Sequence, residues 1–200
     1  MLDKLNNTVK HWITTAASRE LHIAEDSKLY GWIAYGAGML FINLINTFAL
    51  FALVWLFRIP LAHVAVFALS YGLLRFVSFG AHADRLLVCT LLSMTYFIGG
   101  ILLAQHGAIP LPITVISYGF SAVAFFKYAP AETKKRPLDG NLVLFRVLSL
   151  LAFLLSLAAC IGLRVHHNTI YSNLVLIATL CQSVNLLPIT YHLLTERSAP

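Results

Sequence analysis

The chain has 200 residues, of which 59% are hydrophobic and 11% are charged, and its formal net charge at pH 7 is +6. Soluble domains carry roughly 25% charged residues, so this composition excludes an ordinary soluble core and predicts a polytopic membrane protein. The basic residues flank apolar stretches and form no separate basic domain. This distribution argues against nucleic-acid binding and for a charge that reflects membrane topology.

Residues 1–27 predict an amphipathic helix. Apolar residues recur there at steps of three and four residues, at Leu2, Leu5, Val9, Trp12, Ile13 and Ala16. Such spacing suits a helix that lies in the membrane interface, or one that packs on the protein's own spans. The first strong apolar run begins only after about thirty residues, which is too late for a cleavable signal peptide.

Six membrane spans are predicted within residues 29–195. No charged residue occurs from 29 to 57, from 59 to 74 or from 86 to 126. A span needs about 20 residues of helix, so the last of these runs holds two spans, with a turn at residues 105–112. Two further apolar runs, at about 141–163 and 169–194, complete the six. The predicted fold is therefore all-α, with one membrane domain over residues 1–200.

The positions of Lys and Arg predict the orientation, because these residues are retained on the cytoplasmic side. With the N-terminus inside, eleven of the fourteen lie in inner segments. Arg58 and Arg164 fall in outer turns, and Arg146 lies about one turn inside the fifth span. Both termini and the loops at 75–85 and 127–140 are therefore predicted to face the cytoplasm.

A polar interruption between the second and third spans contains Arg75, Gly80, His82 and Cys89. A thiol becomes a strong nucleophile as the thiolate, and a nearby histidine can take its proton. A straight helix would separate His82 and Cys89 by about 10 Å along its axis, so the pair can react only if the helix breaks. Gly80 can adopt backbone angles closed to other residues. A loop at 78–81 is therefore predicted to fold His82 back over the helix that carries Cys89.

Two neighbours of this pair have roles that the sequence leaves open. Arg75 could favour the thiolate, hold a substrate carboxylate, or anchor its span by snorkelling. Asp84 could orient the imidazole of His82, or be solvated in a cytoplasmic turn. By contrast, Cys160 and Cys181 lie among apolar residues within spans, where a thiol is usually an inert small hydrophobe.

Polar residues within the spans also allow two interpretations. Asn43 with Asn46, and Gln182 with Asn185, each lie three residues apart and so share a helix face. They could line a polar cavity near the site, or form hydrogen bonds between helices. No HExxH zinc motif occurs, and neither a metal nor a cofactor is predicted.

The spacing Arg75-x4-Gly80-x-His82-x6-Cys89, followed by the basic loop KYAPAETKKRP at 127–137, resembles the accessory gene regulator protein B family over nearly the whole chain. The resemblance implies a bacterial membrane cysteine endopeptidase that processes a small quorum-sensing propeptide, similar to AgrD, into a thiolactone or lactone. It implies that His82 and Cys89 are the catalytic pair and that Arg75 and Gly80 support them. Phe79 departs from the family, in which many members carry a second glycine.

The implied chemistry suits a site in a membrane. Attack of Cys89 on a peptide carbonyl gives a thioester, which water or a second thiol can resolve. A site in lipid is short of water, which favours a substrate thiol and hence ring closure. The basic cluster Lys134, Lys135 and Arg136 could steer an acidic propeptide tail, or only retain the loop in the cytoplasm. The expected partners are the propeptide and the lipid bilayer, and the sequence leaves a homodimer open.

A small transporter or channel is the alternative class. Ion-coupled carriers usually place Asp or Glu inside their spans, whereas every acidic residue here lies in a terminus or a predicted cytoplasmic loop. A scaffold without chemistry would leave the cluster of Gly80, His82 and Cys89 unexplained. The sequence therefore favours a peptidase.

A single cysteine at position 134 tests the orientation. With the three native cysteines replaced by alanine, Lys134→Cys should not react with an impermeant thiol reagent in intact cells, because its loop is predicted to lie inside. Lysis should make the same cysteine reactive. Labelling before lysis would reverse the predicted orientation and the side assigned to His82.

Overall fold

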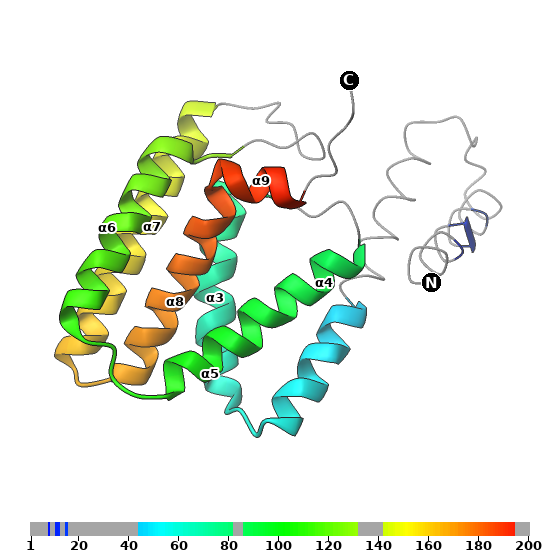
Figure 1. Ribbon diagram of the computed structural model, residues 1–200, viewed down its shortest axis with the longest axis horizontal. Helices are drawn as coiled ribbons and strands as arrows, with labels where there is room; N and C mark the ends of the chain where they lie inside the picture. Colours follow the sequence, from blue (N-terminus) through cyan, green and yellow to red (C-terminus); the bar gives the residue numbers. More distant parts are fainter. Residues whose placement is uncertain are drawn as a thin grey trace. The chain divides into compact units, whose positions relative to one another are not determined.

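The computed structural model describes residues 44–81, 86–131 and 142–194, together with Thr8, His11, Trp12 and Thr15. The chain divides into two compact units, Met1–Leu56 and Phe57–Pro200. Within the described residues, all named secondary structure is helical, and five helices are long and apolar enough to cross a membrane. The predicted all-α class is thus confirmed for this part of the chain (Figure 1).

In the first unit, the structure describes one helix, Leu44–Leu56. This helix lies in the charge-free run where the first span is predicted, and the preceding part of that run is outside the described residues. The predicted amphipathic helix is also mostly outside them, although Thr8, His11, Trp12 and Thr15 have helical backbone. The total of six spans plus a surface helix therefore stays a prediction.

The second unit is a helical bundle. Its elements in chain order are α3 (Leu61–Ser78), α4 (Leu86–Met94), the π-helical turn η1 (Thr95–Gly99), α5 (Gly100–Gln105), α6 (Leu111–Tyr128), α7 (Leu142–Val165), α8 (Thr169–Leu186) and α9 (Pro188–Leu194). The elements α4, η1 and α5 together form one span. The central helix is α8, which packs against α3, α5, α6 and α7 (Figure 1).

The composition of α8 explains its central position. In α8, 67% of the residues are buried, whereas in no other candidate span does the buried share of the most apolar 18 residues exceed 28%. Its buried side chains include many that are small or polar, among them Ser172, Asn173, Thr179, Gln182, Ser183 and Asn185. Small residues let helices approach closely, and polar ones form hydrogen bonds between helices in a medium without water. Such a helix is stable in a membrane only when other helices surround it.

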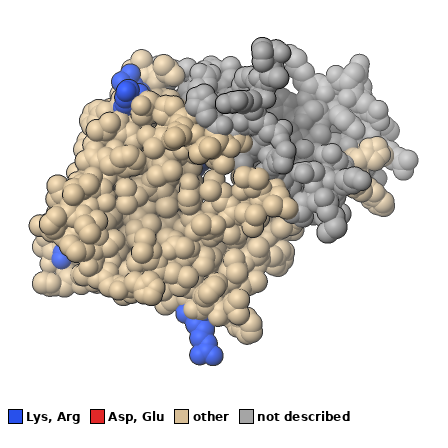
Figure 2. Space-filling model, viewed as in Figure 1, with Lys and Arg blue, Asp and Glu red and all other residues tan. Residues whose placement is uncertain are grey.

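The outer helices present apolar side chains away from the bundle. On α6 and α7, Ile116, Val123, Leu151 and Leu155 are all more than half exposed. Figure 2 shows a face that is almost wholly uncharged over the described residues, with Lys and Arg at its margins. Apolar surface of this kind is stable against lipid tails rather than water, which agrees with helices that cross a membrane.

The turn predicted between the third and fourth of the six expected spans is confirmed. The helix α5 ends at Gln105, and α6 begins at Leu111. Two side chains from neighbouring helices hold the turn: Asn173 Nδ2 donates to Gly107 O at 2.7 Å, and Arg164 Nη2 donates to Ile109 O at 2.7 Å. Arg164, which the sequence offers only as an outer basic residue, therefore also fixes a loop.

The last span is shorter than predicted. We expected it to run from about 169 to 194, but α8 ends at Leu186 and a separate helix, α9, begins at Pro188. Between them Leu187 is extended, with φ −69° and ψ 139°. The reason is steric, because a proline disfavours helical backbone in the residue before it and lacks an N–H for the helix ladder.

Candidate active site

The chain breaks sharply after α3, as predicted. The helix ends at Ser78, and α4, which carries Cys89, begins at Leu86. Phe79 and Gly80 both have positive φ, at 58° and 110°. The segment that contains Arg75 and Cys89 is therefore not one straight helix, and the bend falls at the predicted glycine.

Arg75 holds this bend from within α3. Its Nη1 donates to Phe79 O at 3.0 Å, and its Nη2 donates to Ala81 O at 2.6 Å. The guanidinium therefore turns toward the loop carbonyls. Hydrogen bonds from a charged donor are stronger than neutral ones. Arg75 thus has a role that the sequence did not suggest, which is to position the loop.

The end of α8 holds the other side of the bend. Gln182 Nε2 donates to Phe79 O and to Ser78 Oγ, both at 2.7 Å. The N–H of Ala81 donates to the backbone carbonyl of Asn185 at 2.9 Å. Residues 78–81 are buried, and buried backbone polar atoms need hydrogen-bond partners. Arg75, Gln182 and Asn185 supply those partners.

A third contact comes from the segment after α6. The N–H of Ala131 donates to Ser78 O at 3.0 Å, and the N–H of Gly80 donates to Ala131 O at 3.2 Å. These two bonds form an isolated parallel bridge centred on Phe79 and Ala131. The chain that leads into the basic loop is therefore fixed to the bend that leads to His82.

Phe79 adopts a backbone conformation that favours glycine, with φ 58° and ψ −125°. For a bulky residue this costs about 1–3 kcal/mol. Its ring is buried against that of Phe145, with centroids 5.1 Å apart and planes at 64°, and such a pair contributes about 0.5–1.5 kcal/mol beyond burial. Ring packing therefore offsets part of the strain, and a glycine at this position would adopt the same conformation without strain.

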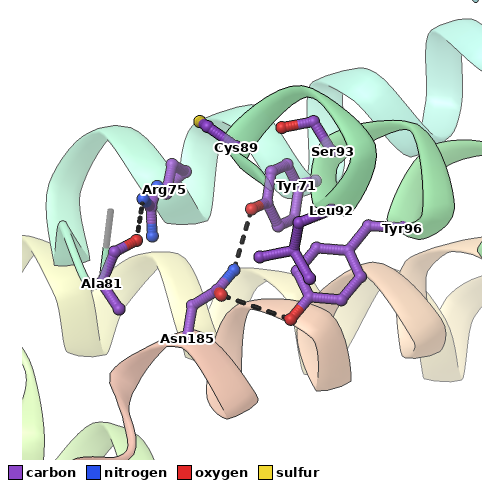
Figure 3. Close-up of a pocket in the computed structure, with 8 residues that line it drawn as sticks. All are labelled: Tyr71, Arg75, Ala81, Cys89, Leu92, Ser93, Tyr96 and Asn185. Carbon is purple, nitrogen blue, oxygen red and sulfur yellow. Dashed lines mark hydrogen bonds between the residues drawn. The ribbon is translucent and has the colours of Figure 1, made fainter. Parts of the chain in front are cut away.

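A cavity of about 120 Å³ opens beside the bend and contains the half-buried thiol of Cys89 (Figure 3). It is lined by Tyr71, Arg75, Ala81, Cys89, Leu92, Ser93, Tyr96 and Asn185. The four residues from α4 and η1 lie at positions i, i+3, i+4 and i+7, so they share one helix face. A cavity of roughly 150 Å³ can hold one benzene molecule, so this one suits a single side chain or peptide group.

Three polar side chains are linked across this cavity. Asn185 Nδ2 donates to the hydroxyl oxygen of Tyr71 at 2.9 Å, and the Tyr96 hydroxyl lies 3.4 Å from Asn185 Oδ1. Figure 3 shows both hydroxyl groups directed at the amide of Asn185. One residue at the end of α8 therefore connects α3 with the span that carries the thiol.

The structure brings together only some of the predicted site residues. Arg75 and Cys89 face one cavity, and Gly80 packs directly against Arg75 and Asn185. The others lie outside the described residues: His82, Asp84, Lys134, Lys135 and Arg136. The catalytic pair and the roles of the basic cluster therefore stay predictions.

The sequence analysis missed Tyr71, Ser93 and Tyr96. A helical signal was present, since Tyr71 precedes Arg75 by four residues and Tyr96 follows Cys89 by seven. Both interpretations of the amides on the last span apply. Asn185 lines the cavity and also bonds to Tyr71 of α3, whereas Gln182 bonds to Ser78 of α3.

The remaining cysteines, Cys160 and Cys181, lie on α7 and α8. Cys160 is 1% exposed, with its Sγ 3.2 Å from Ser172 Oγ, and Cys181 is half-buried. No disulfide joins the three cysteines. Among the described residues, no three His, Cys, Asp or Glu side chains are grouped as metal ligands would be.

These features define a helical membrane protein whose polar site is centred on a cysteine at a break between two spans. The family model Accessory gene regulator B matches residues 7–186, and the chain belongs to that family. It is therefore a multi-pass membrane protein of the accessory gene regulator system.

Several curated relatives match the chain. A putative AgrB-like protein of Listeria innocua is 27% identical over 183 residues, which cover 86% of this chain and 84% of the relative. A putative AgrB-like protein of Clostridium acetobutylicum is 26% identical over 81% of this chain and 77% of its own. Accessory gene regulator protein B of Staphylococcus aureus is 30% identical over 62% of this chain and 64% of its own. No solved structure matches the chain.

Gly80 tests how tightly the bend is held. A Cβ at this position would lie 2.8 Å from Arg75 Nη1 and 2.9 Å from Asn185 O, and φ of 110° is unfavourable for alanine. We expect Gly80→Ala to lose more than the roughly 1–3 kcal/mol of backbone strain alone, because the added methyl also displaces the two groups that hold the loop. Thermal unfolding in detergent measures this loss.

Two glycines serve as matched controls. Gly107 also has positive φ, at 133°, but a Cβ there has no described neighbour within 4 Å, so Gly107→Ala introduces the strain without the clash. Gly119 lies within α6 and is equally unobstructed, so Gly119→Ala should raise stability slightly, because glycine in a helix interior costs roughly 0.5–1 kcal/mol relative to alanine. Equal losses for the changes at positions 80 and 107 would show that the contacts with Arg75 and Asn185 add nothing.

Proposed function

We propose that the chain is a membrane-embedded cysteine endopeptidase that cleaves a small quorum-sensing propeptide and promotes its cyclisation to a thiolactone or lactone. One observation carries the proposal: Cys89 faces the same cavity as Ala81, the residue directly before His82. One residue advances the chain by at most about 3.8 Å, so the two hydrogen bonds that fix Ala81 limit how far His82 can lie from the thiol.

The first step forms an acyl-enzyme. His82 takes the proton of Cys89, and the thiolate attacks the scissile carbonyl carbon, so that a C–S bond forms and the carbonyl π pair moves to oxygen. The carbonyl re-forms as the C–N bond breaks, and His82 returns the proton to the leaving nitrogen. The products are a thioester on Cys89 and the released C-terminal tail with a free amine.

The second step closes the ring. A thiol or hydroxyl within the bound acyl segment gives its proton to His82 and attacks the thioester carbonyl, and the bond to Cys89 breaks as the enzyme thiol regains a proton. Water competes poorly because the cavity is small and has Leu92 and two tyrosine rings in its wall. A substrate thiol conserves the thioester as a thiolactone, and a hydroxyl gives a lactone.

Arg75 contributes to this site in two ways. Its hydrogen bonds to the carbonyls of Phe79 and Ala81 position the loop that precedes His82. Its positive charge also faces the cavity that contains Cys89, and a nearby cation favours a thiolate. The same charge favours binding of an anionic or carbonyl group of the substrate.

The basic cluster Lys134, Lys135 and Arg136 is the proposed contact for the acidic tail of the propeptide. Its support is the anchoring of Ala131, three residues before Lys134, to Ser78 and Gly80. A segment fixed at Ala131 starts beside the bend of the active site. Because only three residues separate Ala131 from Lys134, the chain limits how far the cluster can lie from the bend.

Removal of either member of the pair should abolish cleavage. We expect Cys89→Ala and His82→Ala to insert normally in the membrane and to leave the cognate propeptide intact, because neither can form the thioester. Cys89→Ser should also fail, since a hydroxyl has a far higher pKa than a thiol. The double change Cys160→Ala/Cys181→Ala is the matched control and should keep cleavage, as measured by gel shift of the propeptide.

Trapping of the intermediate gives the stricter result. Wild-type enzyme and propeptide should yield a hydroxylamine-sensitive adduct that mass spectrometry assigns to Cys89. An adduct on Cys160 or Cys181 would contradict the assignment of the nucleophile. Full cleavage by Cys89→Ala would contradict the mechanism.

Neutralisation of the basic cluster should weaken substrate binding. When Lys134, Lys135 and Arg136 are all replaced by glutamine, the Kd for the propeptide should rise and lose its dependence on salt, because charge steering is screened by ions. Acylation of bound propeptide should continue. Lys134→Arg/Lys135→Arg keeps the charge and should keep the affinity. Unchanged binding by a correctly inserted glutamine variant would leave the cluster with a topological role only.

A further inference from the structure

Formation of the thioester places a negative charge on the carbonyl oxygen, and this charge needs a hydrogen-bond donor. Removal of one such donor from a protease typically slows the reaction by about 10²–10³-fold. Five polar side chains in the described wall of the cavity are candidates: Tyr71, Arg75, Ser93, Tyr96 and Asn185. Their hydrogen bonds distinguish them.

Three of the five already donate to protein atoms, although Arg75 and Asn185 keep N–H groups beyond these bonds, because a guanidinium has five and an amide has two. Arg75 donates to the carbonyls of Phe79 and Ala81. Asn185 Nδ2 donates to Tyr71, and the Tyr96 hydroxyl donates to Asn185 Oδ1. The Tyr71 hydroxyl accepts the bond from Asn185 at 2.9 Å, and the described residues provide no acceptor for its own proton. That proton is therefore directed away from the amide and is available to a group in the cavity.

The ring of Tyr71 is held in place by other aromatic rings. It lies nearly parallel to Phe67, with centroids 6.3 Å apart and planes at 14°, and meets Phe97 and Tyr96 edge-on at 5.9 and 6.4 Å. Phe97 and Tyr96 belong to η1, and π-helical turns occur frequently at functional sites. A donor fixed in this way needs no reorganisation when the charge develops. The Ser93 hydroxyl, by contrast, rotates about a single bond.

We propose that the Tyr71 hydroxyl is the oxyanion donor of this site, hydrogen-bonding to the substrate carbonyl oxygen as Cys89 attacks, with Asn185 as the residue that positions it. The inference rests on the proposed function, since it assumes acyl transfer to Cys89. Tyr71 keeps its proton throughout: the C–S bond forms, the π pair moves to oxygen, and the phenol, which is uncharged at neutral pH, stabilises that oxygen.

Asn185 also connects this donor to the other half of the site. Its side-chain amide orients Tyr71, and its backbone carbonyl accepts the N–H of Ala81, which directly precedes His82. One residue at the end of α8 thus sets the position of the oxyanion donor relative to the loop of the general base. A shift of α8 would disturb both together.

Two small probes separate a catalytic role of Tyr71 from a structural one. In the full chain carrying Cys160→Ala/Cys181→Ala, iodoacetamide alkylates Cys89 by displacement, in which no oxyanion forms. p-Nitrophenyl acetate acylates the same thiol through a tetrahedral oxyanion and releases nitrophenolate. We expect Tyr71→Phe to slow the acetylation burst by roughly 10²-fold and to leave the alkylation rate unchanged.

The matched control is Tyr118→Phe. Tyr118 is buried on α6, and its hydroxyl donates to Ser156 O at 3.1 Å, so the change removes one buried phenol hydroxyl that does not line the cavity. Both probe rates should stay at the wild-type level. Asn185→Ala should slow acetylation less than Tyr71→Phe does, and the double variant should be no slower than Tyr71→Phe alone, because the two residues act through one hydrogen bond to the substrate.

Each other outcome overturns the inference. Equal loss of alkylation and acetylation in Tyr71→Phe would mean that the ring only supports the fold, and unchanged acetylation would mean that it does not contact the oxyanion. The proposed function is tested separately, and cleavage of the propeptide by Cys89→Ala would contradict it. If the enzyme is a peptidase, Tyr71→Phe should also lower kcat for the propeptide without raising KM, as expected for a bond made in the transition state.

Discussion

The structure depends on satisfying the polar backbone atoms of one bend inside an apolar bundle. Residues 79–81 leave the helix ladder and are buried, so protein groups must bond with their N–H and C=O groups. Arg75 donates to the carbonyls of Phe79 and Ala81, and Gln182 also donates to the carbonyl of Phe79. The backbone carbonyl of Asn185 accepts the N–H of Ala81. This one set of hydrogen bonds turns the chain between α3 and α4 and opens the cavity at Cys89.

The central helix α8 supplies most of these partners, which explains its unusual composition. Near one end Asn173 holds the turn between α5 and α6, and near the other Gln182 and Asn185 hold the bend of the site. An apolar helix would pack as well against its neighbours but would leave both loops without partners. The polar residues of α8 therefore connect the packing of the bundle to the geometry of the site.

The proposed chemistry uses cations and neutral donors. Arg75 and two tyrosines face the thiol cavity. A cation and fixed hydroxyl groups suit a reaction in which negative charge develops first on sulfur and then on a carbonyl oxygen. Arg75 also holds the backbone of the bend, so one group that builds the bend would also meet the proposed substrate.

The sequence by itself determined where the membrane helices of the second unit run, because each span must be a charge-free stretch of sufficient length. It also located the turn at 105–112 and the bend at Gly80, since glycine and proline restrict local backbone whatever surrounds them. The last span ends at Leu186, short of the predicted Leu194, because Pro188 interrupts the helix ladder.

Only the tertiary structure decided what faces Cys89. The bond between Asn185 and Tyr71 joins residues 114 positions apart, and whether they meet depends on the rotation of α3 and α8 about their own axes. The turn of Arg75 toward the loop depends likewise on a backbone fold that its own sequence neighbours do not specify. Local sequence fixes helices and breaks because these are short-range properties, whereas a site built from several helices is fixed by how the whole bundle packs.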